Sequence, residues 1–214
     1  TINGKEIFSE DGAPKAEFLD FIENNMGDAG NNYISDNYVK YRVKKIVSET
    51  ISKDMNDMQK VKALHDKVCS MVNYDQQNES DKKNHTDISV FLNETSVCEG
   101  YSRAMNLLLH EAGIETYYIK APTHAWNVVN VDGHYFHVDS TWDDDGDTIS
   151  YDWFMKADNE IISDKAHSEW KLLCPSALHD FQTGTLPKCT DIMGDVDENG
   201  IVDGNDATAV LTSY

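Results

Sequence analysis

The stretch HAWNVVNVDGHYFHVDST, residues 124–141, decides the fold because it reads as two strands joined by a tight turn. Asp132 and Gly133 stand between two runs rich in β-branched and aromatic residues. An Asp-Gly pair in that setting is a strong signal for a two-residue hairpin. We therefore expect antiparallel strands over 124–131 and 134–141.

The turn also fixes the register, because each residue before it pairs with the residue equally far after it. His124 then faces Thr141, and Trp126 faces Asp139. This places His124 and Asp139 on one face of the sheet as diagonal neighbours, about 7 Å apart at most. The other face is apolar and should pack against helices; it carries Val129, Val131, Phe136 and Val138.

Upstream of the hairpin, the pattern predicts one more strand over 116–120 and a helix before it. Ser96 and Glu99 have the spacing of a capping box, in which each side chain bonds a free amide of the first turn. The helix should start there and end at Gly113, a favourable residue just past a helix end.

Helical spacing of apolar residues also marks the first third of the chain. It covers 18–22, 39–51 and 57–72, and Asn56 or Asp57 can cap the last of these helices. Helices followed by antiparallel strands predict an α+β fold.

Cys98 falls in the first turn of the predicted helix, where free amides and the helix dipole stabilise a thiolate. The neighbouring Glu99 opposes this effect, so a general base is still needed. His124 on the hairpin can be that base, and Asp139 can orient it. Each residue alone has a simpler structural interpretation, but their joint placement favours a catalytic triad.

Three blocks of sequence closely resemble the transglutaminase-like superfamily: VCEGYSRA at 97–104, HAWN at 124–127 and HVDSTWDD at 137–144. Further similar segments are 61–68, 73–75, 151–154 and 164–167, so the resemblance spans about 17–189. It implies a papain-like core, with the cysteine helix packed on an antiparallel sheet. It also implies that Cys98 is the nucleophile, His124 the base and Asp139 the orienting residue.

The resemblance leaves three kinds of function open. The first is a cysteine peptidase or related enzyme that hydrolyses peptide or amide bonds through a thioester, with no cofactor for catalysis. The second is a non-catalytic binding module with an idle or covered triad, and the third is transglutaminase-type acyl transfer to amines. Trp126 and Trp142 could line the substrate site or belong to the core. The backbone amide of Cys98 is one candidate oxyanion donor.

The C-terminal region 195–206 has the spacing of a calcium-binding loop, with Gly200 at the sharp turn. It ends in Asp, and an apolar run that would start a helix follows; this resembles the first half of a dockerin. A dockerin implies a cohesin partner on a scaffold protein and a secreted, extracellular, cellulosome-type complex. The expected calcium ligands are Asp195, Asp197, Asn199, Ile201 (through its carbonyl), Asp203 and Asp206.

The four cysteines divide into different roles. Cys69 lies on the apolar face of the 57–72 helix and is expected to be an inert core residue. Cys174 and Cys189 bracket a proline-containing loop and could form a disulfide in an oxidising compartment, or remain reduced.

Composition narrows the partners. The 214 residues carry 38 acidic and 18 basic side chains, which argues against nucleic acid or an anionic membrane. The resemblance to the superfamily implies a protein or peptide substrate. We expect three regions: a linker or remnant over 1–16, the cysteine-triad domain over 17–190 and a partial dockerin over 191–214.

Overall fold

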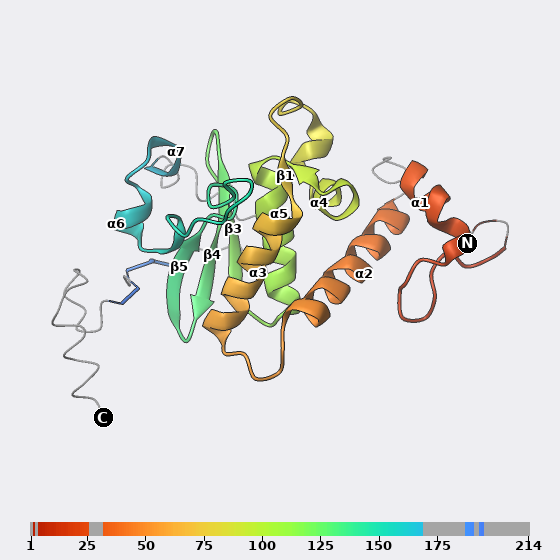
Figure 1. Cartoon of the computed structure of the whole chain (residues 1–214), viewed down its shortest axis with the longest axis horizontal. Coiled ribbons are helices and arrows are strands. Elements are labelled where there is room, and N and C mark those ends of the chain that lie inside the picture. The colour runs from red at the N-terminus through yellow and green to blue at the C-terminus, as the bar shows by residue number, and fades with distance from the viewer. Residues whose placement is uncertain (1, 3, 26–31, 169–186, 191–192, 195–214) are drawn as a thin grey trace.

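The computed structural model describes residues 2, 4–25, 32–168, 187–190 and 193–194 (Figure 1). The calcium loop at 195–206 and Cys174 lie outside the described residues, so both remain predictions. The elements, in chain order, are η1 (Ala16–Phe18), α1 (Leu19–Asn25), α2 (Asn32–Thr50), α3 (Asp57–Met71), β1 (Asn73–Tyr74), η2 (Lys82–His85), α4 (Asp87–Asn93), β2 (Thr95–Ser96), α5 (Cys98–Glu111), β3 (Thr116–Lys120), β4 (Ala125–Val131), β5 (His134–Val138), β6 (Phe154–Lys156), α6 (Asp158–Ile161) and α7 (Lys165–Ser168). The expected α+β class is confirmed.

The main sheet is antiparallel throughout, in the order β3-β4-β5-β6. The β4–β5 register joins Val131 to His134 and Asn127 to Val138, as the hairpin predicts. Asp132 has a φ of 54° and Gly133 a φ of 92°, the left-handed conformation that this kind of turn requires.

The hairpin strands are shorter than expected at their open end. β5 ends at Val138, and the next amide, that of Asp139, donates to the carbonyl of Trp153. A turn follows, in which the Asp143 amide donates to the Asp139 carbonyl.

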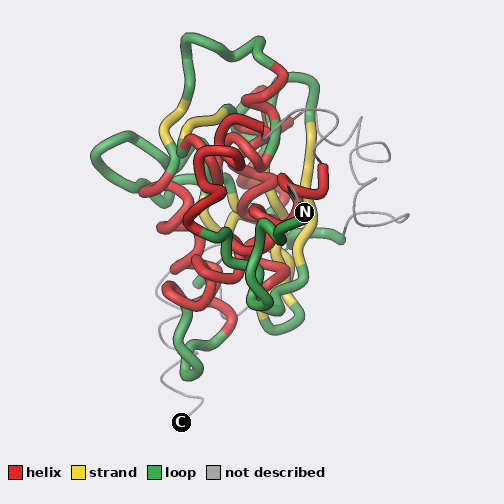
Figure 2. Tube along the Cα trace, turned by 90° about the vertical axis from the view of Figure 1, so that its right-hand side faces the viewer, coloured by secondary structure: helices red, strands yellow, loops and turns green. Residues whose placement is uncertain are grey.

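Helix α5 packs against β3 and β4, and α2 and α3 pack in turn against α5 (Figure 1). Viewed from the α1 end, the helices stand in front of the sheet (Figure 2). The main core lies between these layers, and it contains all four residues expected on the apolar face: Val129, Val131, Phe136 and Val138.

The helix ends show how far local signals hold. Asn56 caps α3 in a capping box with Gln59, as predicted, and Gly113 follows α5 with a φ of 79°. The predicted Ser96–Glu99 box is wrong. Val97 is the N-cap, and the buried Ser96 hydroxyl lies 2.6 Å from the Asn84 carbonyl oxygen, to which it donates.

The first residues pack more closely than the expected linker. Ile7 and Phe8 are buried in a small apolar cluster with Ile22 and Ile34. Within the described part of the chain, no helix combines the length and the apolar character needed to cross a lipid bilayer.

Candidate active site

Cys98 is the first residue of α5 and is half-buried. In the described structure its backbone N–H and that of Glu99 have no acceptor, since the first bonded amide of the helix is that of Gly100. Two free amides and the positive end of the helix dipole thus lie in the helix turn that carries Cys98. This is a setting in which a thiolate is stabilised.

The charge of Glu99, which was expected to oppose the thiolate, is neutralised by a neighbour. Its carboxylate oxygen lies 2.5 Å from the ammonium nitrogen of Lys120 and 3.4 Å from Nδ1 of His85. Because the Lys120 ammonium pairs with this carboxylate, Glu99 is not a free negative charge beside Cys98.

His124 and Asp139 meet as the hairpin register predicts. Nε2 of His124 lies 2.5 Å from Oδ2 of Asp139, and the Cys98 thiol hydrogen-bonds the same ring. Burial lowers the pKa of His124, but the charge of Asp139 and the bond to Cys98 outweigh it and raise that pKa to about 10. The three predicted residues therefore form a continuous Cys–His–Asp chain.

The Asp139 carboxylate is completely buried and fully bonded. Its Oδ1 accepts the backbone N–H groups of Thr141 (3.0 Å) and Trp142 (3.3 Å). Its Oδ2 accepts His124 and, at 2.9 Å, Nε2 of His167. Burial raises the pKa of Asp139, but the two histidines outweigh burial and hold it well below its usual range.

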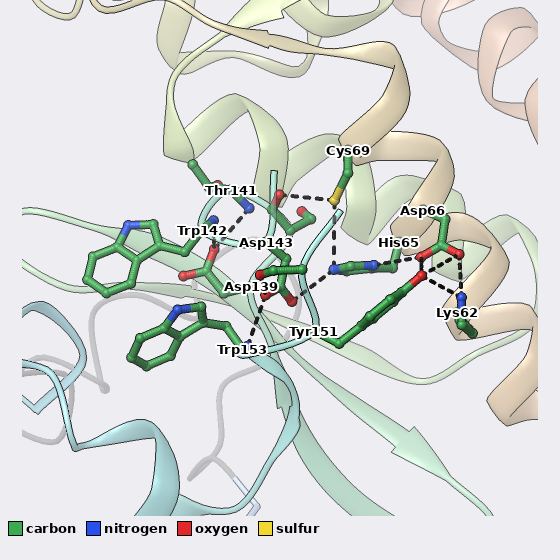
Figure 3. A network of polar contacts seen from close by, with 12 residues as sticks. Lys62, His65, Asp66, Cys69, Asp139, Thr141, Trp142, Asp143, Tyr151 and Trp153 are labelled. Carbon is green, nitrogen blue, oxygen red and sulfur yellow. Dashed lines mark hydrogen bonds and ion pairs between the residues drawn. The ribbon is translucent and has the colours of Figure 1, made fainter. Parts of the chain in front are cut away.

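The turn after Asp139 is anchored by a second polar network (Figure 3). Asp143 is buried and lies 3.1 Å from Nε2 of His65 on α3; it also accepts the Trp153 amide at 2.9 Å. Cys69 donates its thiol proton to the Ser140 carbonyl at 3.2 Å. Helix α3 thereby holds the segment that carries the triad carboxylate.

The interior of this second network is charged. Burial lowers the pKa of His65, but bonds to Asp143 and Asp66 outweigh it and raise that pKa to about 11. Burial raises the pKa of the Cys69 thiol, so the expectation of an unreactive core cysteine stands.

The two tryptophans proposed as substrate contacts differ. Trp126 is 1% exposed, lies stacked beside the His124 ring and donates its indole N–H to Nδ1 of His137. Of the two roles left open for it, the structure supports the core and not the substrate site. Trp142 is half-buried, with its ring centroid 5.0 Å from that of His124, and keeps its proposed place beside the site.

Among the described residues, two groups of side chains have the composition of metal sites. In both groups, hydrogen bonds already occupy the nitrogen and oxygen atoms that would bind a metal. In the group of His137, Asp158 and Cys189, Trp126 donates to Nδ1 of His137, so Nε2 carries the ring proton and bonds Asp158 at 3.0 Å. In the group of His124, Asp139 and His167, the Nε2 atom of each histidine donates to the same oxygen, Oδ2 of Asp139. Hydrogen bonds account for both arrangements.

Comparison with known proteins agrees with the expected superfamily. Residues 44–140 match the model of the Transglutaminase-like superfamily. This segment includes Cys98, His124 and Asp139, the three residues of the candidate triad. The "Kyphoscoliosis peptidase" of Mus musculus is 23% identical over 122 residues, which are 49% of this chain and 18% of the mouse protein.

Solved structures with a similar arrangement include a "TGase", at a TM-score of 0.40 and 17% identity over 58% of this chain and 37% of the other. A second is described as a candidate cysteine protease from Cytophaga hutchinsonii, at a TM-score of 0.41 and 16% identity over 63% and 45% of the two chains. The chain thus spans less than half the length of each of these proteins.

Sequence reasoning missed the part that His167 plays in the site. It lies 28 residues beyond Asp139 and on the short helix α7, so no local period links the two. A similar segment at 164–167 was the one signal that pointed to it.

Proposed function

We propose that this chain is a cysteine-nucleophile enzyme that hydrolyses peptide or amide bonds through a thioester on Cys98. The observation that carries the proposal is the Cys98–His124–Asp139 chain, with Cys98 in the first turn of α5, where two amides are free. The match of residues 44–140 to the Transglutaminase-like superfamily supports this proposal.

In the proposed reaction, His124 holds the proton that Cys98 has given up, and the thiolate attacks the substrate carbonyl carbon. A C–S bond forms as the carbonyl π electrons move onto oxygen, where the free amide of Cys98 stabilises the charge. The C–N bond then breaks, and His124 gives its proton to the leaving amine. Water then gives a proton to His124, and its oxygen attacks the carbonyl carbon of the thioester. The C–S bond breaks, which releases the acid, and His124 returns the proton to the sulfur.

The non-catalytic alternative requires that the cysteine be idle or covered. Cys98 is half-buried, not sealed, and its partner His124 is in bonding contact. These observations favour the enzyme. Acyl transfer differs only in the acceptor, because an amine would then take the place of water.

The test is turnover of a denatured protein mixture by the full chain, with new peptide ends and incorporation of a labelled primary amine both read by mass spectrometry. Hydrolysis predicts new ends without amine label, and Cys98→Ser should abolish them. Cys69→Ser is the matched control, since this second cysteine is buried. Amine label alone would identify a transferase. The absence of both products would support the non-catalytic binding module.

We also propose that residues 195–206 bind one calcium ion and belong to a dockerin that joins a secreted, cellulosome-type complex through a cohesin. The donor set supports this, because carboxylate, amide and carbonyl oxygens at this spacing suit calcium. Calorimetry of the full chain with calcium should show one site, lost in Asp195→Ala and kept in Asp191→Ala. No heat of binding in the unaltered chain would contradict the proposal.

A further inference from the structure

Asp139 serves two histidines through a single oxygen. Nε2 of His167 lies 2.9 Å from Oδ2, the same atom that His124 contacts at 2.5 Å. All three side chains are buried, and the two imidazole rings stand edge to face with centroids 5.1 Å apart. A Cys–His–Asp triad needs one imidazole, so the second requires an explanation.

The hydrogen-bond chemistry fixes the proton of the second ring. An ionised carboxylate only accepts hydrogen bonds, so both Nε2 atoms must carry a proton. Nδ1 of His167 is buried and has no partner in the described part of the chain. A proton there would be an unsatisfied buried donor, an unfavourable state.

The surroundings of His167 are largely aromatic. Its ring stacks on Trp153 at 4.7 Å and meets Trp142 and Trp126 edge to face. Among the described residues, the titratable groups that face it are Asp139 and His124. His167 is therefore an Nε2–H donor held in an aromatic cage.

We propose that His167 is a positioning residue, which fixes Oδ2 of Asp139 and divides its negative charge between two rings, so that His124 remains able to release its proton. The inference rests on the proposed function, since it assigns a role within that site. Thr141 and Trp142 hold Oδ1 through their amides, and His167 completes the clamp on the other oxygen. Without His167, Asp139 would direct its whole charge to His124.

The first test is the pH profile of Cys98 alkylation by iodoacetamide in the full chain. Among the described residues, three titratable side chains face the His124 ring: Asp139, Cys98 and His167. The basic limb reports the loss of the His124 proton. His167→Phe keeps an aromatic ring but removes the donor, so the limb should move upward by about 0.5–1 pH unit. His167→Gln can place an amide N–H at the same reach and should restore the limb to its original position.

A matched control is His137→Gln, because His137 is a second buried histidine that bonds Asp158 and not Asp139. It should leave the limb unchanged. If the limb of His167→Phe stays in place or moves downward, or if Gln behaves like Phe, the ring only fills space and the proposal is overturned.

The second test needs no variant and no catalysis. In ¹⁵N-histidine spectra of the unaltered chain, His167 should carry its proton on Nε2, with Nδ1 unprotonated. A doubly protonated ring or the Nδ1–H tautomer would overturn the proposal even if the enzyme turns over. Absence of turnover with the expected tautomer would instead refute the proposed function and leave the hydrogen-bond assignment intact.

Discussion

At the scale of single residues, the negative charge of Asp139 is what turns an imidazole beside a thiol into an ion pair. Asp139→Asn keeps the shape of the side chain and removes that charge, so the pKa of His124 should fall from about 10. We expect alkylation of Cys98 at pH 6 to slow by at least about tenfold, because the thiolate loses its charged partner. Peptide-resolved mass spectrometry measures the rate.

Asp144→Asn is the control for that prediction. Asp144 lies in the same turn and accepts the Tyr101 hydroxyl at 2.7 Å, without contact to His124 or Cys98 recorded in the structure. Cys98 in the Asp144→Asn variant should be alkylated at the same rate as in the unaltered chain. Equal rates for Asp139→Asn and the unaltered chain would remove Asp139 from the triad.

The residue scale also shows what sequence could and could not predict. The meeting of His124 and Asp139 followed from the two-residue turn, because a hairpin register is a local property. The contact of His167 with Asp139 depends on how α7 returns to the sheet. The role of Trp126 stayed open in the sequence for a related reason: burial by distant residues decides whether an aromatic side chain faces solvent.

At the scale of elements, the start of α5 depends on a close approach at Gly100. A Cβ at this position would lie 1.8 Å from Oγ of Ser96 and 2.8 Å from the Thr86 carbonyl oxygen. Gly100→Ala should therefore lower the free energy of unfolding by about 1–3 kcal/mol and slow alkylation of Cys98, since the helix start must shift. Denaturant titration and alkylation measure both effects.

Gly113→Ala tests the other end of the same helix. Open space surrounds Gly113, but its φ of 79° disfavours a side chain, so a loss of about 1 kcal/mol is expected. Cys98 should react at its original rate. If Gly100→Ala is as stable and reactive as the unaltered chain, the close packing at the helix start is wrong.

The elements themselves were largely predictable, because apolar periods and turn residues are local. The hairpin, the strand over 116–120 and the cap of α3 all followed from such signals. The cap of α5 did not, since Ser96 bonds Asn84 and Ser89 across a tertiary contact instead of its own helix. A capping motif competes with any acceptor that the fold brings near.

At the scale of the whole molecule, a buried histidine couples stability to pH. The folded-state pKa of His65 is raised to about 11, against an unfolded value of about 6.5. Above pH 6.5 the folded chain therefore keeps a proton on His65 that the unfolded chain loses. The contribution of His65 to stability is complete below that pH and declines as pH rises, by at most about 1.4 kcal/mol per unit. His124 adds little to this slope, because the proton it holds in the ion pair comes from Cys98.

The depressed pKa of Asp139 sets the other side, because its contribution is lost as pH falls below the unfolded value of about 3.9. The melting temperature should thus be highest between about pH 4 and 6.5 and fall steadily towards pH 9. Calorimetry at constant ionic strength measures it. His65→Gln should flatten the decline, whereas a melting temperature that rises from pH 7 to 9 would contradict this account.

The most direct measurement is the rate of Cys98 alkylation against pH in the full chain, with buried Cys69 as the internal reference. An ion pair with His124 predicts fast labelling of Cys98 well below the ordinary thiol pKa of about 8.5, while Cys69 remains unlabelled until the chain unfolds. Labelling of Cys98 that follows an ordinary thiol, or that is as slow as Cys69, would contradict the central claim that this cysteine is an activated nucleophile.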